Sequence, residues 1–381
     1  MKILNILTDT NIGGAGRLLV HVLSNLDRAR FDGWVVLPKD SALLPAVRET
    51  GFPVIEMTYG ADRSWDRRSV RELRRLIREL HPDLVHCHAA LSGRVAAWLE
   101  HVPCRFYTRH SVFPPSKRLT TFPGRQINGL LSRVISTDII AVAEAAKKNL
   151  TDTGVPERMI TVIPNGVEPL REPSPEEVDA LRDKLGIGRE DFVCGIAARL
   201  EDYKGHSYLL EAAKTVLAAH PATDFLIIGD GTEADALKKQ AAESGIAGNV
   251  IFAGFADDVA PYYGLMDLNL NCSWGTEATS LALAEGMSAG VPAVATTYGG
   301  NPAMITDGVN GLLVPEKDPP ALAAAICRLI EDPDLLADLS EGALRVYRER
   351  FTARAMTERL EEMYEAAYAR AKRKRKEKSE K

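Results

Sequence analysis

The sequence predicts an α/β protein built from two Rossmann-like domains, each with a parallel sheet. Short β-branched runs alternate with segments of helical period, and a Pro-rich, acidic stretch from Pro164 to Glu177 divides the alternation into two series. Strands separated by helices form right-handed βαβ units and hence parallel sheets. The chain has 381 residues, more than the about 250–300 at which a single hydrophobic core stops growing.

The expected strands lie on either side of the Pro-rich stretch. The first series has Ile3–Thr8, Trp34–Leu37, Val54–Met57, Leu84–Cys87, Arg105–Thr108, Ile139–Ala143 and Thr161–Ile163. The second has Phe192–Ala197, Phe225–Ile228, Val250–Ala253, Leu268–Asn271, Ala293–Ala295 and Leu312–Val314. We therefore expect an N-terminal domain over residues 1–165 and a C-terminal domain over residues 166–352, with a linker near residues 164–175.

The end of the chain has a different pattern. Met356, Leu360, Met363 and Tyr364 share one face of a helix that we expect over residues 353–371. Residues 372–381 hold seven basic and two acidic side chains. We expect this basic tail to be disordered.

Composition argues against several classes of protein. The five cysteines are odd in number and far apart, which favours reduced thiols over a disulfide framework, and none are spaced for zinc. No stretch has the roughly 18 apolar residues of a membrane span, and the apolar start is too short for a signal peptide. These features favour a cytoplasmic protein.

Charge is distributed unevenly. Residues 1–165 hold 23 Lys/Arg and 16 Asp/Glu, whereas the remainder holds 24 and 36. A basic half suggests an anionic partner, although drift of surface charge produces the same asymmetry. No nucleic-acid recognition module is present, so a nucleic-acid role would have only the basic tail.

A glycine-rich loop at residues 11–16 follows the first strand and precedes a helix expected at Leu18–Leu26. Gly13, Gly14 and Gly16 would let the backbone approach a phosphate at the positive end of a helix. A tight strand–helix turn explains these glycines equally well. Their spacing differs from Gly-x-Gly-x-x-Gly, and no acid ends the next strand, which disfavours an NAD(P) site.

Two cations follow the strand Phe192–Ala197. Arg199 and Lys204 would lie at the carboxyl end of a parallel strand, where such sheets bind ligands. The planar fork of Arg and the compact charge of Lys both suit diphosphate oxygens. The alternative is a solvated surface pair.

Two glutamates flank the start of a helix near residue 280. Either Thr279 or Ser280 can cap that helix, with Glu277 before it and Glu285 inside it. Eight residues at a rise of about 1.5 Å separate the carboxylates by roughly 12 Å, a span resembling that from a donor sugar to its ribose. The helix N-terminus between them suits a diphosphate. The alternative for Glu285 is a partly exposed helix charge.

Histidines cluster at two strand ends. His110 follows the strand Arg105–Thr108, where it could hydrogen-bond a sugar. His86 and His88 share one face of the preceding strand. No third metal ligand is apparent, so packing is favoured over metal binding.

Taken together, these segments resemble the family 4 glycosyltransferases over nearly the full chain. The matching segments are Gly13–Gly16, Asp83–His88, Thr108–His110, Ile163–Val167, Ala198–Gly205, Gly229–Gly231, the pair Glu277 and Glu285, and Gly290–Ala295. Each is short, and their order and spacing carry the resemblance.

The resemblance implies a GT-B fold of two facing domains with an interdomain cleft, retention of anomeric configuration and no metal cofactor. Arg199 and Lys204 would bind the donor diphosphate. Glu285 would hold the ribose, and Glu277 with the amides of Thr279, Ser280 and Leu281 would hold the sugar. His110 would contact the sugar from the other domain, and Gly14 would approach the phosphate or the acceptor. The C-terminal helix would pack back on the N-terminal domain.

The chain also departs from the family pattern. Ala278 and Thr279 stand where the family commonly has glycine and an aromatic residue, which leaves the identity of the donor sugar open. The frequency of UDP donors in the family favours a UDP-linked hexose, with GDP as the alternative. Two other functions remain: a nucleotide-sugar epimerase of the same architecture, and a non-catalytic nucleotide-sugar-binding homologue. The acceptor would be a glycan, a lipid-linked molecule or another hydroxyl compound.

Two segments suggest a peripheral contact with an anionic membrane. Residues 63–80 carry seven arginines around apolar residues, and residues 112–125 mix Phe113, Leu119 and Phe122 with basic side chains. The basic tail could add to this contact. The alternative for residues 63–80 is that the apolar stripe is the core face of a Rossmann-like helix.

Overall fold

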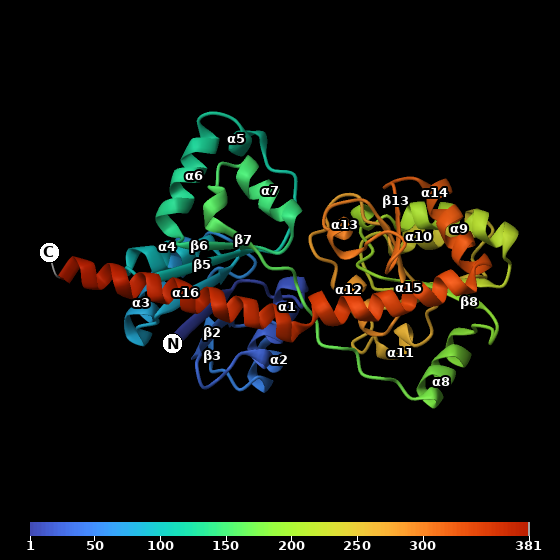
Figure 1. Cartoon of the computed structure of the whole chain (residues 1–381), viewed down its shortest axis with the longest axis horizontal. Helices are drawn as coiled ribbons and strands as arrows, with labels where there is room; N and C mark the ends of the chain where they lie inside the picture. The colour runs from blue at the N-terminus through green and yellow to red at the C-terminus, as the bar shows by residue number, and fades with distance from the viewer. Residues whose placement is uncertain (380–381) are drawn as a thin grey trace. The chain divides into compact units, whose positions relative to one another are not determined.

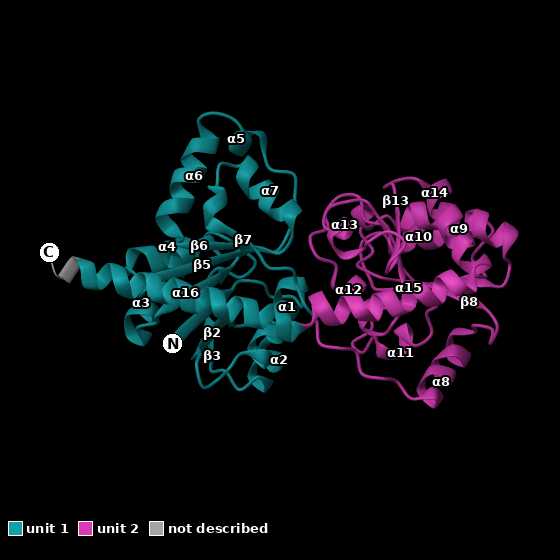
Figure 2. Cartoon of the chain, in the orientation of Figure 1, with its two compact units in different colours: residues 1–166, 353–381 teal, residues 167–352 magenta. Residues whose placement is uncertain are grey.

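The computed structural model describes residues 1–379 and divides into two compact units, shown in different colours in Figure 2. Unit 1 consists of Met1–Gly166 and Ala353–Lys381, and unit 2 of Val167–Thr352. Each unit has a parallel sheet covered by helices. The predicted α/β fold class is confirmed, and all thirteen predicted strands form with ends within two residues of their expected positions.

Unit 1 has a seven-stranded sheet in the order β3-β2-β1-β4-β5-β6-β7. Its strands are β1 (Lys2–Leu7), β2 (Asp32–Pro38), β3 (Val54–Met57), β4 (Leu84–His88), β5 (Cys104–Arg109), β6 (Asp138–Ala141) and β7 (Ile160–Val162). Its helices are α1 (Gly14–Asn25), α2 (Leu44–Glu49), α3 (Arg67–Leu80), α4 (Leu91–Leu99), α5 (Lys117–Thr120), α6 (Gly124–Ile135), α7 (Glu144–Asp152) and α16 (Ala353–Ser379) (Figure 1).

Helix α16 packs into the core of unit 1 although it comes from the end of the chain. Met356, Leu360 and Tyr364 are buried there with residues of α1 and the sheet, and Met363 packs at the edge. Arg30 adds ion pairs with Glu361 and Glu365 at 3.0 and 2.7 Å. The apolar face read from the sequence therefore lies against the first half of the chain.

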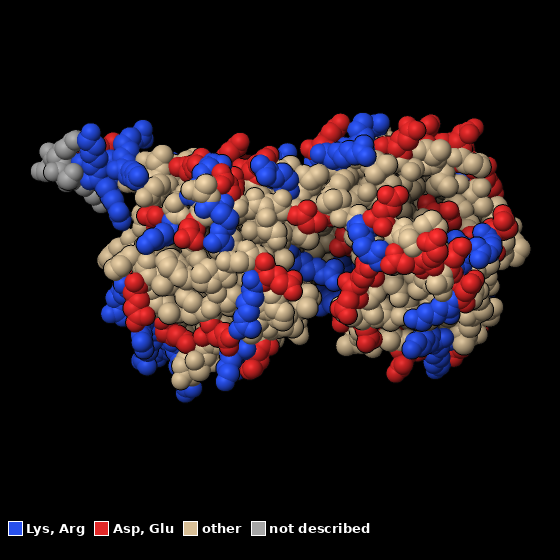
Figure 3. Space-filling view, turned by 90° about the horizontal axis from the view of Figure 1, so that it is seen from below, with Lys and Arg blue, Asp and Glu red and all other residues tan. Residues whose placement is uncertain are grey.

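The expected disordered tail differs from the structure. Helix α16 continues to Ser379, whereas we expected the helix to end near residue 371. Lys and Arg are good helix formers, and Arg373 lies 3.8 Å from Glu377 one turn later, which favours continuation of the helix. Residues 380–381 of the predicted tail lie outside the described residues. The basic side chains near this end form a visible cluster in Figure 3.

Helix α1 begins earlier than predicted, at Gly14 instead of Leu18. Gly13 takes the N-cap position, so Gly14 and Gly16 belong to the helix. A Cβ atom on Gly16 would lie 2.3 Å from a methyl group of Leu43. Gly16 therefore allows close packing between α1 and the segment leading into α2.

The apolar stripe of residues 63–80 is core. Helix α3 begins after Asp66, whose carboxylate accepts hydrogen bonds from the amides of Arg68 and Ser69. Val70, Leu73 and Ile77 are buried against β-strand residues. The structure thus supports the core-face alternative for this helix, and the suggestion of a membrane-binding apolar stripe there is wrong. Within the described residues, no helix is long and apolar enough to cross a bilayer.

Unit 2 has a six-stranded sheet in the order β10-β9-β8-β11-β12-β13. Its strands are β8 (Phe192–Ala197), β9 (Thr223–Ile228), β10 (Val250–Gly254), β11 (Leu268–Asn271), β12 (Ala293–Thr296) and β13 (Gly311–Val314). Its helices are α8 (Pro175–Leu185), α9 (His206–Ala219), α10 (Ala234–Glu243), α11 (Ala260–Tyr263), α12 (Leu281–Ser288), α13 (Asn301–Met304), α14 (Pro319–Glu331) and α15 (Pro333–Val346).

The two chain crossings between the units run side by side. The amide of Val167 donates to the carbonyl oxygen of Phe351 at 2.9 Å, and the Tyr347 hydroxyl donates to the carbonyl oxygen of Val167 at 3.0 Å. These bonds lie within unit 2 and tie its first residue to its last turn.

In unit 2, acidic residues are frequent on the face drawn in Figure 3.

Candidate active site

A short turn after β8 positions Lys204 in unit 2. Residues Asp202–Lys204 form a 3-10 turn that ends at Gly205, which has a φ of +76°. A Cβ atom on Gly205 would lie 2.1 Å from the Cys272 carbonyl oxygen, so this left-handed position needs glycine. The indole Nε1 of Trp274 donates to the Asp202 carbonyl oxygen at 2.9 Å. The turn is thereby fastened to the segment that follows β11.

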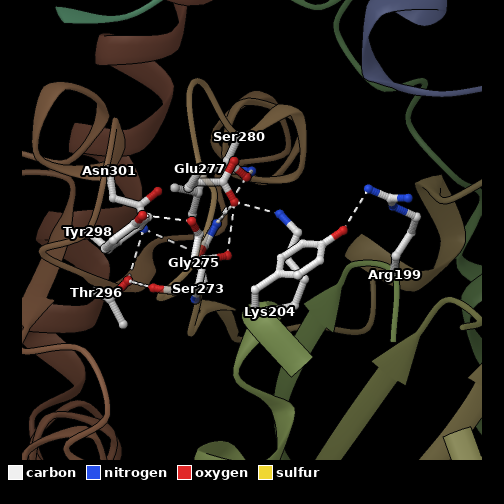
Figure 4. A network of polar contacts seen from close by, with 12 residues as sticks. Arg199, Lys204, Ser273, Gly275, Glu277, Ser280, Thr296, Tyr298 and Asn301 are labelled. Atoms are coloured by element: carbon white, nitrogen blue, oxygen red, sulfur yellow. Dashed lines mark hydrogen bonds and ion pairs between the residues drawn. The ribbon is translucent and has the colours of Figure 1, made fainter. Parts of the chain in front are cut away.

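Glu277 lies at the centre of a buried polar cluster, drawn in Figure 4. Its Oε2 accepts hydrogen bonds from Lys204 Nζ at 2.8 Å, Ser273 Oγ at 3.0 Å and Asn271 Nδ2 at 3.3 Å. The side chains of Glu277 and Lys204 are 7% and 18% exposed. A carboxylate this deeply buried requires compensation, and here a cation and two neutral donors supply it.

The loop that carries Glu277 is held from its backbone as well. The Gly300 amide donates to the Glu277 carbonyl oxygen at 3.1 Å. Gly299 has a φ of +62°, and a Cβ atom there would lie 2.1 Å from the same oxygen. The close approach of residues 299–300 therefore fixes the position of the Glu277 backbone relative to the ends of the strands.

Helix α12 starts next to this cluster. Ser280 is its N-cap, with Oγ accepting from the Leu283 amide at 3.3 Å. The same Oγ accepts from Asn271 Nδ2 at 3.1 Å, which links the cap to the Glu277 cluster. Of the two predicted caps, the structure selects Ser280, while Thr279 is buried one residue earlier. Leu281 is the first helical residue, and Glu285 is half-buried one turn later.

Arg199 is positioned differently from Lys204. Its guanidinium is exposed, and Nη2 donates to the Tyr203 hydroxyl at 2.9 Å (Figure 4). An exposed arginine held by one neutral partner keeps most of its donors available. The two predicted cations thus flank the same 3-10 turn, one paired with Glu277 and one facing solvent.

In unit 1, the glycine-rich loop leads directly into α1. The Gly13 amide donates to the Asn11 carbonyl oxygen at 3.0 Å, and Gly13 and Gly14 are exposed. A Cβ atom on Gly13 would meet nothing within 4 Å. The backbone at the start of α1 is therefore accessible at the positive end of the helix dipole.

Three histidines form a second cluster in unit 1, where β4 and β5 end. His86 Nδ1 lies 2.6 Å from the Tyr364 hydroxyl, and its Nε2 lies 2.7 Å from Thr108 Oγ1. His88 Nδ1 lies 3.0 Å from His110 Nε2. The outer nitrogens, His88 Nε2 and His110 Nδ1, are buried and have no partner among the described residues.

Burial keeps these imidazoles neutral. It lowers the pKa of His88 from 6.5 to about 4. Burial, aided by the charges of His88 and Arg109, also holds the pKa of His110 well below its ordinary value. For His86 the same direction follows from burial and from its two histidine neighbours. The cluster therefore offers hydrogen bonds without charge near neutral pH.

Two protein-family models match the chain. The model described as Glycosyltransferase Family 4 matches residues 12–171, and the model described as Glycosyl transferases group 1 matches residues 191–332. The chain belongs to these glycosyltransferases. The predicted resemblance is confirmed, and with it the expectation that the protein is a sugar-transferring enzyme.

Similarity to individual relatives extends over most of this glycosyltransferase. It is 28% identical to alpha-monoglucosyldiacylglycerol synthase of Acholeplasma laidlawii over 72% of this chain and 73% of the relative. It is 25% identical to UDP-Gal:alpha-D-GlcNAc-diphosphoundecaprenol alpha-1,3-galactosyltransferase of Escherichia coli over 82% and 87%. Among solved structures, Anabaena HepE in complex with UDP has 25% identity and a TM-score of 0.83, with 96% and 100% of the chains covered.

The predicted site residues of the glycosyltransferase fall into two groups. Unit 2 brings together Lys204, Glu277 and Ser280, with Thr279 and Leu281 adjacent in the chain. Unit 1 holds Gly14 at the start of α1 and His110 beside His88. Each group is defined within its own unit.

Several polar residues of the unit 2 cluster were not predicted. Asn301 Nδ2 donates to Asn271 Oδ1 and to Thr296 Oγ1, both at 3.2 Å. The Tyr298 hydroxyl donates to the Gly275 carbonyl oxygen at 2.7 Å. One sequence signal was present: Thr296 ends an otherwise apolar strand, and Asn271 ends a strand in which Leu and Asn alternate. The groups of described residues include none arranged to hold a metal ion.

Proposed function

We propose that this glycosyltransferase moves a hexose from a UDP-sugar to a hydroxyl acceptor with retention of anomeric configuration and without a metal ion. The observation that carries the proposal is the Lys204–Glu277 pair beside the N-terminus of α12. It combines a cation for the diphosphate, a carboxylate for the sugar hydroxyls and helix amides for the sugar and the adjoining phosphate oxygens. The UDP bound to the HepE relative supports the choice of nucleotide.

The unit 2 residues have distinct roles in this proposal. Arg199 and Lys204 bind the diphosphate and stabilise the negative charge that grows as the anomeric C–O bond breaks. Glu277 and the amides near Thr279, Ser280 and Leu281 hold the transferred sugar. Glu285, on the second turn of α12, accepts hydrogen bonds from the ribose hydroxyls.

The reaction balances without a dedicated base. The bond from the anomeric carbon to the phosphate oxygen breaks, and a bond from that carbon to the acceptor oxygen forms on the same face. The acceptor proton passes to a leaving phosphate oxygen, which yields the glycoside and UDP. The only buried carboxylate of the unit 2 cluster, Glu277, already accepts from three donors, which supports a role in binding instead of proton abstraction.

Unit 1 supplies neutral contacts in this scheme. His110 contacts a sugar hydroxyl, and the backbone at Gly14 approaches a phosphate or the acceptor. The geometry that supports this is the accessible start of α1 and the unpartnered Nδ1 of His110.

A donor screen tests the proposal. The full chain is incubated in EDTA with UDP-glucose or UDP-galactose and one of two acceptors. These are diacylglycerol, the lipid part of the product in one relative's name, and GlcNAc-diphosphoundecaprenol, which appears in the name of another. We expect UDP release only when an acceptor is present, and a product whose anomeric proton shows the donor's configuration by NMR. Inversion, or activity restored by Mn²⁺ alone, contradicts the proposal. Interconversion of sugars without an acceptor indicates the epimerase, and tight binding without release indicates the non-catalytic homologue.

Glu285→Gln provides a sharper test of the donor site. Loss of a charge-assisted acceptor should weaken UDP binding by about 10-fold, since such bonds contribute roughly 1.5–3 kcal/mol. Glu331→Gln, an exposed glutamate on α14, is the control. Unchanged UDP affinity in Glu285→Gln, measured by calorimetry, would place the ribose elsewhere.

The acceptor is proposed to be lipid-linked, as in cell-surface polysaccharide or glycolipid synthesis, and to be met at an anionic membrane. Helix α6 supports this because Ile127, Leu130, Leu131 and Val134, spaced as one helical face, are all exposed, whereas Gly129, Ser132 and Ile135 face inward. Apolar side chains normally occupy the inward face of such a helix. Helices α5 and α6 stand out from the sheet of unit 1 in Figure 1.

The surroundings of this apolar face are basic. We call the exposed residues Phe113, Leu119, Phe122, Ile127, Leu130, Leu131 and Val134 the α6 surface; they are seven of the thirteen large exposed hydrophobic residues described. Residues 101–137 hold six Lys/Arg and no Asp/Glu. Near an anionic bilayer each basic side chain contributes about 1 kcal/mol, and the apolar groups insert at the interface. Charge complementarity therefore favours an anionic lipid surface as the partner.

Vesicle co-sedimentation tests the membrane contact. The chain should bind phosphatidylglycerol vesicles more strongly than phosphatidylcholine vesicles at low salt, and Leu130→Ser with Leu131→Ser should reduce that binding by 10-fold or more, since each buried side chain is worth about 1.5–3 kcal/mol. Phe255→Ser, 61% exposed in unit 2, is the matched control. Equal binding by wild type and the double variant would exclude the α6 surface, and no preference for anionic vesicles would favour a soluble acceptor.

A further inference from the structure

The histidine cluster of unit 1 contains more groups than the sugar contact of His110 requires. His86 and His88 lie two residues apart on β4, so they project from the same face of the sheet. Their rings lie 4.3 Å apart at 30°, and the rings of His88 and His110 lie 5.2 Å apart at 22°. His86 and His88 are 2% and 4% exposed. Three imidazoles in a buried stack carry a desolvation cost that packing alone does not justify.

Hydrogen bonds on both ring nitrogens fix the imidazole of His86. Both nitrogens of His86 are engaged, one by the Tyr364 hydroxyl of α16 and one by Thr108 Oγ1 of β5. The parallel register of β4 and β5 aligns His88 with Thr108, which brings His110 next to His88. The ring of His88 is thus held between a fixed His86 and the hydrogen bond to His110.

The contact between His88 and His110 restricts their tautomers. A distance of 3.0 Å between Nδ1 and Nε2 requires one nitrogen to carry a proton and the other to accept it. If His88 Nδ1 donates, the proton of neutral His110 sits on Nδ1. If His110 Nε2 donates, its Nδ1 is bare. In either arrangement the two outer nitrogens are one donor and one acceptor.

The outer nitrogen of His110 indicates the kind of group it would bind. His110 Nδ1 is buried and has no partner among the described residues, and a buried unpaired group costs about 1–3 kcal/mol. A sugar hydroxyl satisfies Nδ1 in either tautomer, because a hydroxyl both donates and accepts. A phosphate oxygen would satisfy it only when Nδ1 carries the proton.

We propose that His88 is a positioning residue for the transfer reaction: its Nδ1 holds His110 Nε2, and thereby orients the His110 ring and presents its Nδ1 to a hydroxyl of the substrate. This inference rests on the proposed function of His110 as a sugar contact. His88 itself touches no substrate in this scheme. Its effect passes through His110, and the ring of His88 packs on His86, which Thr108 and Tyr364 hold in place.

The low basicity of the pair agrees with this role. Burial lowers the pKa of His88 to about 4. The titratable groups next to the pair are His86 on β4 and Arg109 on β5, and the Tyr364 hydroxyl on α16 bonds to His86. None is a carboxylate, so nothing among them favours an imidazolium. The pair therefore remains neutral through the physiological range.

Two substitutions of equal polarity separate positioning from packing. The amide of Asn can occupy the place of His Nδ1, whereas the amide of Gln reaches toward the place of Nε2. His88→Asn should therefore keep kcat within about 3-fold of wild type, whereas His88→Gln and His88→Ala should lose about 10²-fold, the cost of a misplaced group near the reaction. KM for the UDP-sugar should change little, since the proposed cationic contacts to the diphosphate, Arg199 and Lys204, are in unit 2. His101→Asn, an exposed histidine on unit 1, is the control.

A double-mutant cycle tests whether His88 acts through His110. If it does, His88→Gln should add less than about 3-fold to the loss caused by His110→Ala, because residues that share one path are not additive. Equal losses for His88→Asn and His88→Gln, or fully additive losses in the cycle, would overturn the proposal.

A second readout does not depend on activity. The ¹⁵N shift of His110 Nε2 reports whether that nitrogen is hydrogen-bonded, and we expect a hydrogen-bonded shift in wild type and His88→Asn, but the shift of an unbonded nitrogen in His88→Gln. Identical spectra in the three folded proteins would overturn the positioning role even if no UDP-sugar is turned over. Absence of turnover with a hydrogen-bonded His110 Nε2 would instead count against the proposed function alone.

Discussion

The polar cluster around Glu277 in unit 2 and the histidine cluster in unit 1 both lie where parallel strands end, but they differ in charge. In unit 2 a buried carboxylate is paired with Lys204 at 2.8 Å. In unit 1 three imidazoles remain neutral, and two of their nitrogens have no partner among the described residues. A charged cluster can exchange partners with an ionic group, whereas a neutral one suits hydroxyls. We infer that the cations of unit 2 bind the diphosphate, whereas the histidines of unit 1 contact only hydroxyls.

The largest expected effect is that of Lys204→Ala. It removes a cation from the growing phosphate charge and should lower kcat by about 10²-fold or more. It also leaves Glu277 buried without its cation, which costs up to about 3–5 kcal/mol, less here because Lys204 is 18% exposed. Transfer rates at saturating donor and urea unfolding measure the two effects. Lys214→Ala, exposed on α9, is the control, and a wild-type kcat in Lys204→Ala would remove the basis for the comparison.

The second largest expected effect is that of acidification on the stability of the histidine cluster. The folded-state pKa of His88 is about 4, below its unfolded value of 6.5, so the unfolded chain binds the proton more readily. The contribution of neutral, buried His88 to the free energy of unfolding is therefore fully present above about pH 6.5. It is lost as the pH falls toward about 4, and the free energy of unfolding then decreases by up to about 1.4 kcal/mol per pH unit for one such histidine. His86 and His110 act in the same direction.

Urea unfolding at several pH values checks this dependence. His88→Asn removes one titrating group, so its unfolding free energy should fall less steeply between about pH 6.5 and pH 4 than that of wild type. Parallel curves for the two proteins would show that His88 is not buried as a neutral group.

The sequence predicts the strands, but it does not predict the contacts within the two polar clusters. The strands and the two-series organisation follow from local alternation of apolar residues, so all thirteen could be predicted. The Lys204–Glu277 pair joins residues 73 positions apart, and no local pattern encodes that contact. Single motifs predicted both residues as ligands of a donor without predicting that they bind each other.

The histidines show the same limit. That His86 and His88 share a face follows from strand geometry, but the bond from His88 to His110 depends on the register of β4 against β5. The contact with Tyr364 requires α16, 278 residues away, to return to unit 1. Two other errors have local causes: α1 begins at the glycines because Gly13 caps it, and α16 continues because its basic residues also favour helix.

A smaller effect is expected for Tyr364→Phe. It removes the hydroxyl 2.6 Å from His86 Nδ1 and leaves a buried nitrogen unpaired, at a cost of about 1–3 kcal/mol. Tyr368→Phe is the matched control, since its hydroxyl donates to the Asp83 carboxylate at 3.1 Å near the surface. Equal urea midpoints for the two variants would show that the hydrogen bond from α16 to His86 does not stabilise the histidine cluster.

The smallest effect is expected for Ser280→Ala. Loss of the N-cap of α12 should lower stability by about 1 kcal/mol. The substitution also removes an acceptor of Asn271, so the cost should exceed that of Ser174→Ala, the N-cap of α8 in the same unit. Thermal unfolding of both variants makes the comparison, and an equal or larger shift for Ser174→Ala would show that the cap of α12 is not coupled to the Glu277 cluster.

Calorimetric titration with UDP tests the division between the units most directly. If the cations of unit 2 bind the diphosphate and the histidines of unit 1 contact only hydroxyls of the sugar or the acceptor, Lys204→Ala should weaken UDP binding by 10-fold or more, since a charge-assisted contact is worth about 1.5–3 kcal/mol. His110→Ala should bind UDP as tightly as wild type, because UDP has no transferred sugar. A loss of UDP affinity in His110→Ala equal to that in Lys204→Ala would contradict this division.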